Sequence, residues 1–311
     1  MTPYFSIIIP VYNRERFIAR AINSCLEQDF EDFEIIVVDD GSIDKSVDVV
    51  KSFTDHRVKL ICHGANRGVS PARNTGVDEA IGEWIIFLAS DDELLQGALS
   101  IIHRRTIEVD SSICRLQFMV QMDTEVSPVP ALKAEYWDYI KYIKWQEESC
   151  NNLSETSPIV KRSTFDKVRY SNDRTLEGPY HLEFMKQFDA WSFPDIVKLV
   201  HCGGKDRLSK PNVRRNIQMA RDQSLSGEML LKNHGKALKQ YAPKCYRKQI
   251  SGLATLFFLS GNRVKGIKYS FYSLMSNFLS LRNWVILIFG VVGPKPLAWL
   301  RCFRAKLSQN L

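Results

Sequence analysis

The chain has 311 residues, 45% of them hydrophobic and 25% charged, a composition that predicts a globular protein with a sizeable core and excludes disorder of the whole chain. The longest uncharged apolar run, "WVILIFGVVG" at residues 284–293, is far shorter than the roughly 18 residues of a membrane-spanning helix, and the N-terminal sequence lacks the basic start of a signal peptide. The formal net charge of +7 is uneven, since residues 1–200 carry 22 Lys and Arg against 32 Asp and Glu, and residues 201–311 carry 20 against 3.

The first hundred residues alternate short apolar stretches, which predict buried strands, with amphipathic stretches, which predict helices. We expect strands at residues 5–11, 33–40, 58–63 and 83–88 and helices at residues 15–27, 44–53 and 70–81. The last of these helices has good start signals, with Ser70 as N-cap and Pro71 at the first helical position. Strands that are nearly all apolar indicate an α/β fold with a mostly parallel, Rossmann-like sheet covered by helices on both faces.

Polar side chains follow each of the four predicted strands. The clusters are Tyr12 and Asn13, Asp39 and Asp40, Asn66, and Asp91 and Asp92. In parallel sheets, ligands bind beyond the carboxyl ends of the strands. Because four strands would deliver these groups to one rim, we predict a ligand site there.

The middle of the chain is less regular, and the strand pattern ends near residue 210. We expect a further strand at residues 111–121, a helix at 134–149, and a loop leading into a helix within 169–188. Basic, amphipathic helical segments follow at residues 214–235, 242–263 and 264–280. The predicted organisation is therefore a first domain of residues 1–208, with halves 1–100 and 101–208, and a basic helical C-terminal region of residues 209–311.

Two loops carry groups suited to a nucleotide. In "DDGS", residues 39–42, a carboxylate at the strand end can accept from a base N–H or a ribose hydroxyl, and Gly41 permits the tight turn. The loop "HGANRGVSPARN", residues 63–74, adds Arg67 and Arg73 beside a helix start, where anions are favoured. Each of these loops alone is common in proteins and does not identify a nucleotide site. The order of the motifs along the chain is more specific.

In that order, the residues resemble glycosyltransferase family 2, the inverting sugar transferases with the A-type nucleotide-sugar-binding fold. The resemblance rests on "FSIIIPVYNRERFIARAINSCLEQDFEDFEIIVVDDGSIDKS" and "NRGVSPARNTGVDEAIGEWIIFLASDD". It covers about residues 4–100 and extends more weakly to about 210. It implies transfer of a sugar from a nucleotide-diphosphate donor, a UDP-sugar first, to a glycan or lipid-linked acceptor in bacterial surface polysaccharide or lipopolysaccharide synthesis.

The resemblance also implies which residues bind the donor. The positions that match the family's donor-binding residues are Pro10, Tyr12 and Asn13 beside the base, Asp39 on the base, and Asn66, Arg73, Ser90 and Asp91. Asp91 matches the last acid of the D-x-D motif, the usual ligand of Mn²⁺ or Mg²⁺ at the donor diphosphate. Ala89 stands where the first acid usually does, so we expect looser donor binding rather than a loss of metal dependence. His201 matches a family histidine near the metal and is the second predicted metal ligand, with Asp92 as a further helper.

The catalytic base is harder to place, because the family's Glu-Asp pair is missing. The corresponding stretch is "NDRTLEGPYHLEFMKQF". We predict Glu177 as the base, with Glu183 and Asp173 as alternatives, and Arg207 as a further phosphate contact. The missing pair and Ala89 also motivate a different function, a degenerate family member that binds a nucleotide or glycan without catalysis.

The basic tail predicts an acidic partner. It would suit a cytoplasmic protein held peripherally on the anionic inner face of the plasma membrane, where a lipid-linked acceptor would lie. The apolar residues expected to insert are Trp284, Ile286, Leu287, Phe289, Trp299 and Leu300. The alternative is a helical extension that packs these residues against the first domain or a second subunit. Nucleic-acid binding is disfavoured, because the first part of the chain is acidic and no recognition motif is present.

Overall fold

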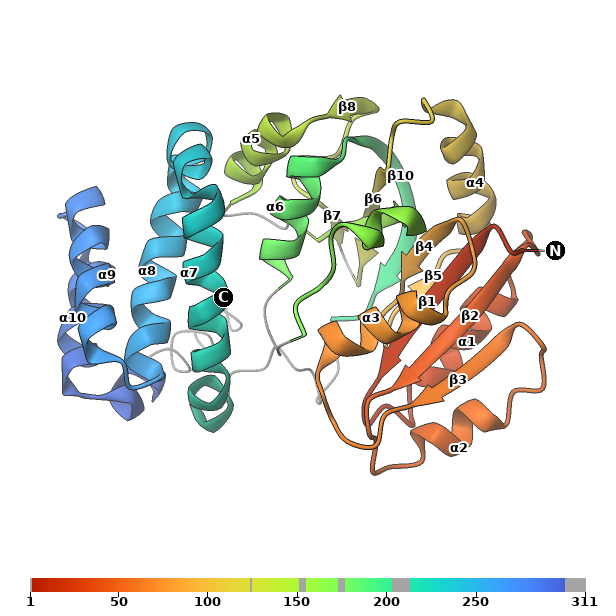
Figure 1. Cartoon of the computed structure of the whole chain (residues 1–311), viewed down its shortest axis with the longest axis horizontal. Helices are drawn as coiled ribbons and strands as arrows, with labels where there is room; N and C mark the ends of the chain where they lie inside the picture. The colour runs from red at the N-terminus through yellow and green to blue at the C-terminus, as the bar shows by residue number, and fades with distance from the viewer. Residues whose placement is uncertain (1, 124, 151–154, 173–176, 203–212, 300–311) are drawn as a thin grey trace. The chain divides into compact units, whose positions relative to one another are not determined.

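A ten-stranded sheet organises the first of the two units into which the chain divides, Met1–Gly203 and Gly204–Leu311 (Figure 1). The computed structural model describes residues 2–123, 125–150, 155–172, 177–202 and 213–299. The predicted domain boundary at 208/209 and Arg207 lie outside the described residues, as do Asp173 and Leu300.

One half of the sheet is entirely parallel and has the strand order β3-β2-β1-β4. Its strands are β1 (Phe5–Val11), β2 (Phe33–Asp39), β3 (Val58–Cys62) and β4 (Trp84–Phe87), and its helices are α1 (Ile18–Leu26), α2 (Ser46–Lys51) and α3 (Val69–Glu79). Val11 lies opposite Asp39 in the register of β1 and β2, and Ile8 lies opposite Phe87 in that of β1 and β4. The carboxyl ends of these three strands therefore meet at one rim, which confirms the α/β prediction.

The other half of the sheet is mixed. It contains β5 (Glu93–Leu94), β6 (Arg115–Met122), β7 (Glu125–Ser127), β8 (Glu135–Trp137), β9 (Ser157–Lys161) and β10 (Ala190–Val200). β9 runs antiparallel to both β4 and β6, and β10 runs parallel to β6. The accompanying helices are α4 (Ala98–Glu108), α5 (Tyr139–Ser149), the short 3₁₀ helix η1 (Arg162–Asp166) and α6 (Gly178–Gln187).

Several helices begin a few residues from their predicted starts, and for two of them the structure shows the reason. The helix predicted from residue 134 starts at Tyr139, because residues 135–137 form β8 against β10, and the Asp138 side chain caps the helix by accepting from the Lys141 N–H at 2.7 Å. The helix predicted to be capped by Ser70 starts at Val69 after Gly68, whose φ is 106°. The Asp40 carboxylate accepts from the Gly68 N–H, and the loop before the helix therefore ends at Gly68 rather than at Ser70.

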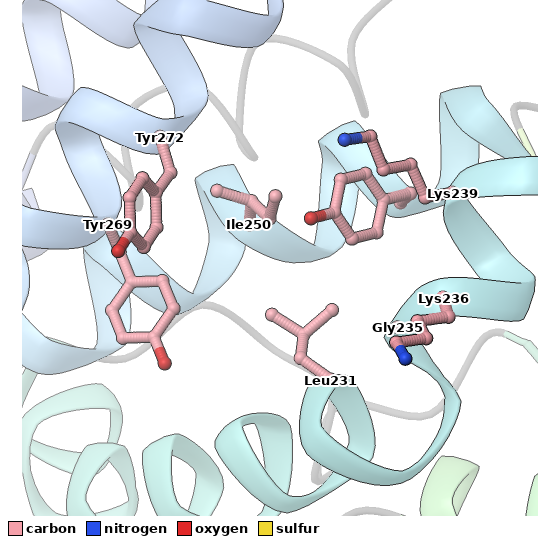
Figure 2. A pocket seen from close by; sticks show the side chains of 8 residues that line it. Leu231, Gly235, Lys236, Lys239, Ile250, Tyr269 and Tyr272 are labelled. Carbon is pink, nitrogen blue, oxygen red and sulfur yellow. The ribbon is translucent and has the colours of Figure 1, made fainter.

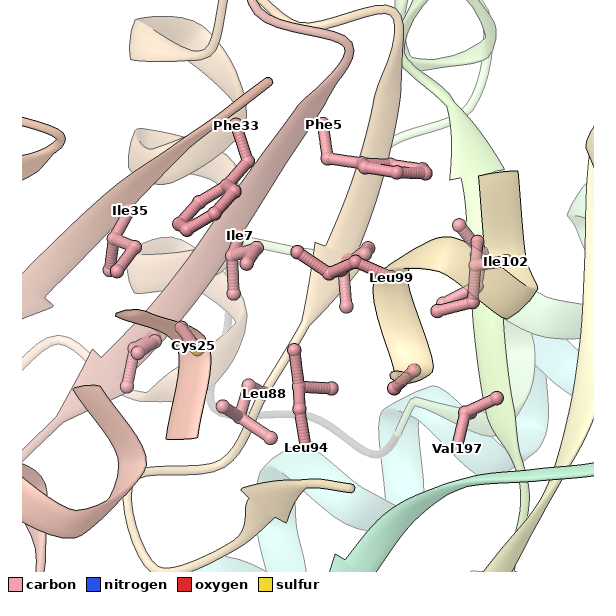
Figure 3. Close-up of a cluster of buried hydrophobic side chains, with 14 of the residues drawn as sticks. Phe5, Ile7, Cys25, Phe33, Ile35, Leu88, Leu94, Leu99, Ile102 and Val197 are labelled. Atoms are coloured by element: carbon pink, nitrogen blue, oxygen red, sulfur yellow. The ribbon is translucent and has the colours of Figure 1, made fainter. Parts of the chain in front are cut away.

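The core of the first unit lies between the parallel strands and α1 and α4 (Figure 3). Alternate side chains of β1, such as Phe5 and Ile7, are fully buried on this face, as the two-residue period of a strand requires. On the other face, Ile8 meets α3 so closely that a Cβ at Gly76 would lie 2.4 Å from its side chain. Only glycine lets α3 approach, and this packing fixes the helix that carries Arg73.

The second unit is a set of helices, α7 (Val213–Tyr241), α8 (Pro243–Leu259), α9 (Arg263–Ser276) and α10 (Leu281–Val292). The helical C-terminal region is therefore confirmed. Phe258 lies at its centre, where a Cβ at Gly266 or Gly290 would be 2.6 or 2.2 Å from the ring. A pocket of about 260 Å³ opens between α7, α8 and α9, with Lys239 and Tyr272 among its lining residues (Figure 2). In the described part of the chain, every helix is too short or too polar to cross a membrane.

This core corrects part of the predicted membrane-inserting set. Ile286 is only 7% exposed, because its side of α10 packs into the core around Phe258, and Leu287 and Phe289 pack against the same cluster. Ile286 is therefore not available to a lipid surface, whereas Leu287 and Phe289 are only partly buried. Trp299 is exposed, and the indole N–H of the half-buried Trp284 donates to the Phe278 carbonyl at 3.0 Å.

Candidate functional site

Asp39 ends β2 and is the most buried acid of the rim, at 2% exposure. Its Oδ2 accepts from the main-chain N–H groups of Gly41 and Ser42 at 3.1 and 3.0 Å. Its Oδ1 is buried and has no hydrogen-bond partner among the described residues. A buried acceptor without a partner costs free energy, so this oxygen is suited to a ligand that brings an N–H or O–H group.

The neighbouring acid, Asp40, has a different environment. Its carboxylate accepts from the main-chain N–H groups of Arg67 and Gly68 at 2.9 and 2.7 Å, and it contacts His63 Nδ1 at 2.9 Å. Both oxygens are therefore used in holding the loop that carries Asn66, which is half-buried at the rim. Gly41 lets this loop pass close to the turn after β2. Its φ is 74°, and a Cβ there would lie 2.7 Å from the main chain of Ala65.

Asn13 ties the ends of β1 and β2 together. Its φ of 53° is left-handed, a region where asparagine is tolerated. Its side-chain oxygen accepts from the Ile43 N–H and its own N–H donates to Ser42 Oγ, both at 2.9 Å. The side-chain oxygen predicted to border a donor thus holds the "DDGS" turn, while Tyr12 stands open beside it at 38% exposure and Pro10 lies half-buried in β1.

The side chains of the acidic turn after β4 lie in different surroundings. Asp91 keeps a partly exposed carboxylate, 4.0 Å from Arg14 Nε, while Ser90 is buried and Ala89 is exposed. Asp92 is buried with the Lys198 ammonium 3.9 Å away. Burial raises the pKa of Asp92 to about 6, although Lys198 opposes the rise. Asp91 is therefore the carboxylate of this turn that is open to a ligand.

His201 is paired with an acid that the sequence analysis missed. Its Nε2 lies 2.5 Å from Glu93 Oε1, and its Nδ1 lies 3.8 Å from Asp123 Oδ1. Arg20 links this pair to the acidic turn, since it contacts Glu93 at 3.0 Å and donates to the Asp91 carbonyl at 2.8 Å. The only signal for Glu93 in the sequence was its place two residues after Asp91.

A divalent cation would find few protein ligands here. Among the described residues, no group of three His, Cys, Asp or Glu side chains is placed to hold one. The carboxylate of Asp91 still fits a hard cation of the Mg²⁺ or Mn²⁺ type, because such ions bind through one or two carboxylates together with the phosphates of a substrate.

A second group of residues joins α3 to the start of α6. Arg73 Nη1 lies 2.5 Å from Glu177 Oε1, and the guanidinium lies over the rings of Phe87 and Tyr170 at 5.3 and 5.2 Å. Burial opposes the charge on both partners, but the pairing outweighs it, so the pKa of Glu177 is lowered and that of Arg73 is raised. The structure thus brings a predicted donor residue and the predicted base into contact.

Other side chains of α3 hold the loop before α6. Asn74 Nδ2 donates to the Tyr170 carbonyl at 2.9 Å, and Arg169 Nη1 donates to Asp78 Oδ1 at 2.6 Å. Tyr170 and Tyr180 stack with ring centroids 3.9 Å apart. Sequence reasoning did not assign Asn74 this role, although the residue stands in the motif quoted for the resemblance.

Two other acids, Glu183 and Asp173, were predicted as alternative bases. Glu183 lies six residues further along α6, where Oε1 accepts from the exposed Gln187 at 3.1 Å. Asp173 falls in a stretch outside the described residues.

Comparison with known proteins identifies what the chain resembles. The family model "Glycosyl transferase family 2" matches residues 6–168. An uncharacterized glycosyltransferase of Haemophilus influenzae is 46% identical over 60% of this chain and 73% of its own length. The Escherichia coli enzyme WfgD, a UDP-Glc:α-D-GlcNAc-diphosphoundecaprenol β-1,3-glucosyltransferase, is 27% identical over 68% of this chain and 79% of its own length.

Two solved structures share the fold. Staphylococcus aureus TarS 1–349 in complex with UDP-GlcNAc aligns over 89% of this chain and 90% of that one, with a TM-score of 0.57 and 17% identity. The mannosyltransferase PcManGT of Pyrobaculum calidifontis, in complex with GDP-Man and Mn²⁺, aligns over 97% and 88%, with a TM-score of 0.55 and 14% identity. At these identities the likeness shows the fold alone.

Proposed function

The chain belongs to glycosyltransferase family 2, and from this premise we propose that it transfers a sugar, with inversion, from a UDP-sugar to a lipid-linked glycan of a bacterial surface polysaccharide. The observation that carries the proposal is the buried Oδ1 of Asp39 at the carboxyl end of a parallel strand, which has no partner in the described part of the chain. A nucleobase N–H or a ribose hydroxyl would supply the missing partner. The UDP-Glc named for WfgD and the UDP-GlcNAc bound by TarS support uridine as the base.

The leaving diphosphate would lie near Asp91. Negative charge builds on the diphosphate as the sugar–phosphate bond breaks, and a bound Mn²⁺ or Mg²⁺ would stabilise that charge. The open carboxylate of Asp91 supports such a site, and so does the Mn²⁺ named with PcManGT. With Ala89 in place of an acid, the chain would offer one carboxylate fewer to the donor. His201 remains a proposed second ligand of the metal. To bind it through Nε2, the imidazole would first have to give up its contact with Glu93.

Glu177 would act as the base. The acceptor hydroxyl attacks the anomeric carbon from the face opposite the diphosphate; the new C–O bond forms as the sugar–phosphate bond breaks, and the hydroxyl proton passes to the Glu177 carboxylate. The ion pair with Arg73 keeps this carboxylate ionised and ready to accept a proton.

A thermal-shift screen tests the donor. UDP and UDP-sugars with Mn²⁺ are expected to stabilise the chain, by about 2.7 kcal/mol at a ligand concentration 100 times Kd, and ADP and CDP at the same concentrations serve as controls. If no nucleoside diphosphate stabilised the protein, the proposal would fail. Release of free sugar from the stabilising donor without an acceptor would argue against the alternative of a binding protein without catalysis.

We also propose that the second unit lies on an anionic membrane surface through the turn between α9 and α10, the place where a lipid-linked acceptor would be found. Residues 229–311 contain 14 Lys and Arg and neither Asp nor Glu, which matches anionic headgroups in charge. Large apolar side chains at this turn are exposed: Met275 at 85%, Phe278 at 65%, Leu279 at 92% and Leu281 at 76%. In this proposal they replace Ile286, which the structure buries.

Sedimentation with vesicles tests this surface. Because burying one such side chain is worth roughly 1.5–3 kcal/mol, the double variant Phe278→Ser/Leu279→Ser is expected to bind anionic vesicles at least about tenfold more weakly than the parent chain. Val264→Ser, at the far end of α9 and 80% exposed, is the matched control and should bind normally. Equal binding by the double variant and the parent would count against insertion at this turn.

A further inference from the structure

A buried arginine contacts His181, which is a neighbour of the predicted base Glu177. Arg115 of β6 is 3% exposed. Its Nε donates to Gln117 Oε1 at 2.8 Å, its Nη1 lies 3.3 Å from His181 Nδ1, and its guanidinium lies over Tyr142 and Phe184. A guanidinium has donors and no acceptor, so the Nδ1 that faces it must be the accepting nitrogen of His181.

The tautomer of His181 follows from this contact. With Nδ1 accepting, the ring proton of the neutral imidazole is on Nε2. Nε2 is the atom that faces Glu177, 3.9 Å from Oε2. Burial lowers the pKa of His181 to about 3, Arg115 acts in the same direction, and Glu177 opposes them. The ring is therefore neutral near pH 7 and can offer an N–H without taking or losing a proton.

The two oxygens of Glu177 thus have different neighbours. Oε1 is held by Arg73, and Oε2 is the oxygen nearer the His181 Nε2–H; the side chain as a whole is 38% exposed. The distance of 3.9 Å is too long for a hydrogen bond, yet contacts of catalytic groups commonly shorten once substrate is bound. The oxygen left to receive a proton is Oε2.

We propose that His181 is a positioning residue, which Arg115 holds in the Nε2–H tautomer so that it directs Oε2 of Glu177 toward the acceptor hydroxyl. The inference rests on the proposed role of Glu177 as the base. His181 touches neither substrate nor the reacting atoms; it acts through Glu177. Sequence reasoning could not reach it, because its partner Arg115 lies on β6, 66 residues earlier in the chain.

The proposal has a signature in the pH profile. The charged and titratable groups that face Glu177 are Arg73 of α3, His181 of α6, Lys198 of β10 and Tyr170 before α6. The base works when ionised, and its lowered pKa extends activity toward acid pH. Removing the His181 N–H removes one group that favours the carboxylate, so the pKa of Glu177 should rise and the acid limb of kcat/KM should move to higher pH.

The test compares His181→Phe with His181→Gln. Phenylalanine keeps the ring and loses both nitrogens, and it is expected to lower kcat at least about tenfold, with the donor KM within about twofold and the acid limb shifted upward. Glutamine can accept from Arg115 and donate to Glu177, and it should restore most of kcat and the original limb. Lys186→Ala, at an exposed position of the same helix, should behave like the parent.

A double-mutant comparison distinguishes failure of the His181 inference from failure of the Glu177 assignment. In a Glu177→Gln background, His181→Phe should leave the residual rate unchanged, because both changes remove the same function. If Glu177→Gln is inactive while His181→Phe matches the parent in kcat and in acid limb, this inference is overturned and the base stands. An equal loss from His181→Phe in both backgrounds would also overturn it. Normal turnover by Glu177→Gln would remove the base assignment itself.

Discussion

Replacing Glu177 by glutamine is expected to lower kcat about 10²- to 10⁴-fold, the usual contribution of a general base, while the dissociation constant of the donor stays close to that of the parent. Glutamine has the same shape and can still accept from Arg73 through its side-chain oxygen, so the start of α6 should keep its position. It cannot take the proton of the acceptor hydroxyl. Initial rates give kcat, and calorimetric titration of the donor into protein with Mn²⁺ gives the dissociation constant.

Glu183→Gln, measured in parallel, decides between the two described acids. Glu183 lies on the same helix and accepts from Gln187 rather than from a buried cation. Loss of turnover in Glu183→Gln together with near-normal turnover in Glu177→Gln would move the base to Glu183. Loss in Glu177→Gln alone would support Glu177, the base predicted from the sequence, which the structure pairs with Arg73.

Asp39→Asn should weaken donor binding and leave the fold intact. The amide oxygen can still accept from the Gly41 and Ser42 N–H groups, so the amide NH₂ would take the place of the free Oδ1. A donor group of the ligand would then meet another donor instead of a carboxylate oxygen. Losing a hydrogen bond to a charged group costs about 1.5–3 kcal/mol, so we expect a rise in the dissociation constant of UDP of roughly 10- to 150-fold, measured by calorimetry.

Asp40→Asn is the matched control for Asp39→Asn. Both oxygens of Asp40 already accept from the chain or contact His63, so the asparagine would turn its NH₂ toward an N–H group of the loop. The expected result is a free energy of unfolding lower by about 1–3 kcal/mol, seen in urea denaturation. If Asp39→Asn lost stability in the same way and bound UDP normally, the free oxygen would not be a ligand contact.

The parallel half of the sheet could be predicted because its strands are apolar throughout and its polar residues come after them. The assignment of Asp39 rather than Asp40 came from the family resemblance. The strand pattern alone could not separate them, since adjacent residues at a strand end point in different directions and the following turn decides which is covered. The sequence also could not show that Arg73 and Glu177 touch, because this contact joins distant parts of the chain through the packing of α3. The apolar run at residues 284–293 lay within the region predicted to be helical, but the sequence could not show which of its side chains would pack around Phe258.

The tethers on α3 have a consequence for how this protein can change over evolution. Arg73, Asn74 and Asp78 connect the helix at the donor rim directly to Glu177 and to the loop before it. On the proposed roles, these tethers set the place of Glu177 relative to the donor rim, and Tyr142 under the Arg115 guanidinium links the start of α6 to α5 as well. A substitution in α3 that broke one of these tethers would shift Glu177 relative to the donor rim, so the two groups of residues are expected to change together over evolution. A lineage that kept the tethers would keep the spacing of the two groups while the rest of the chain diverged.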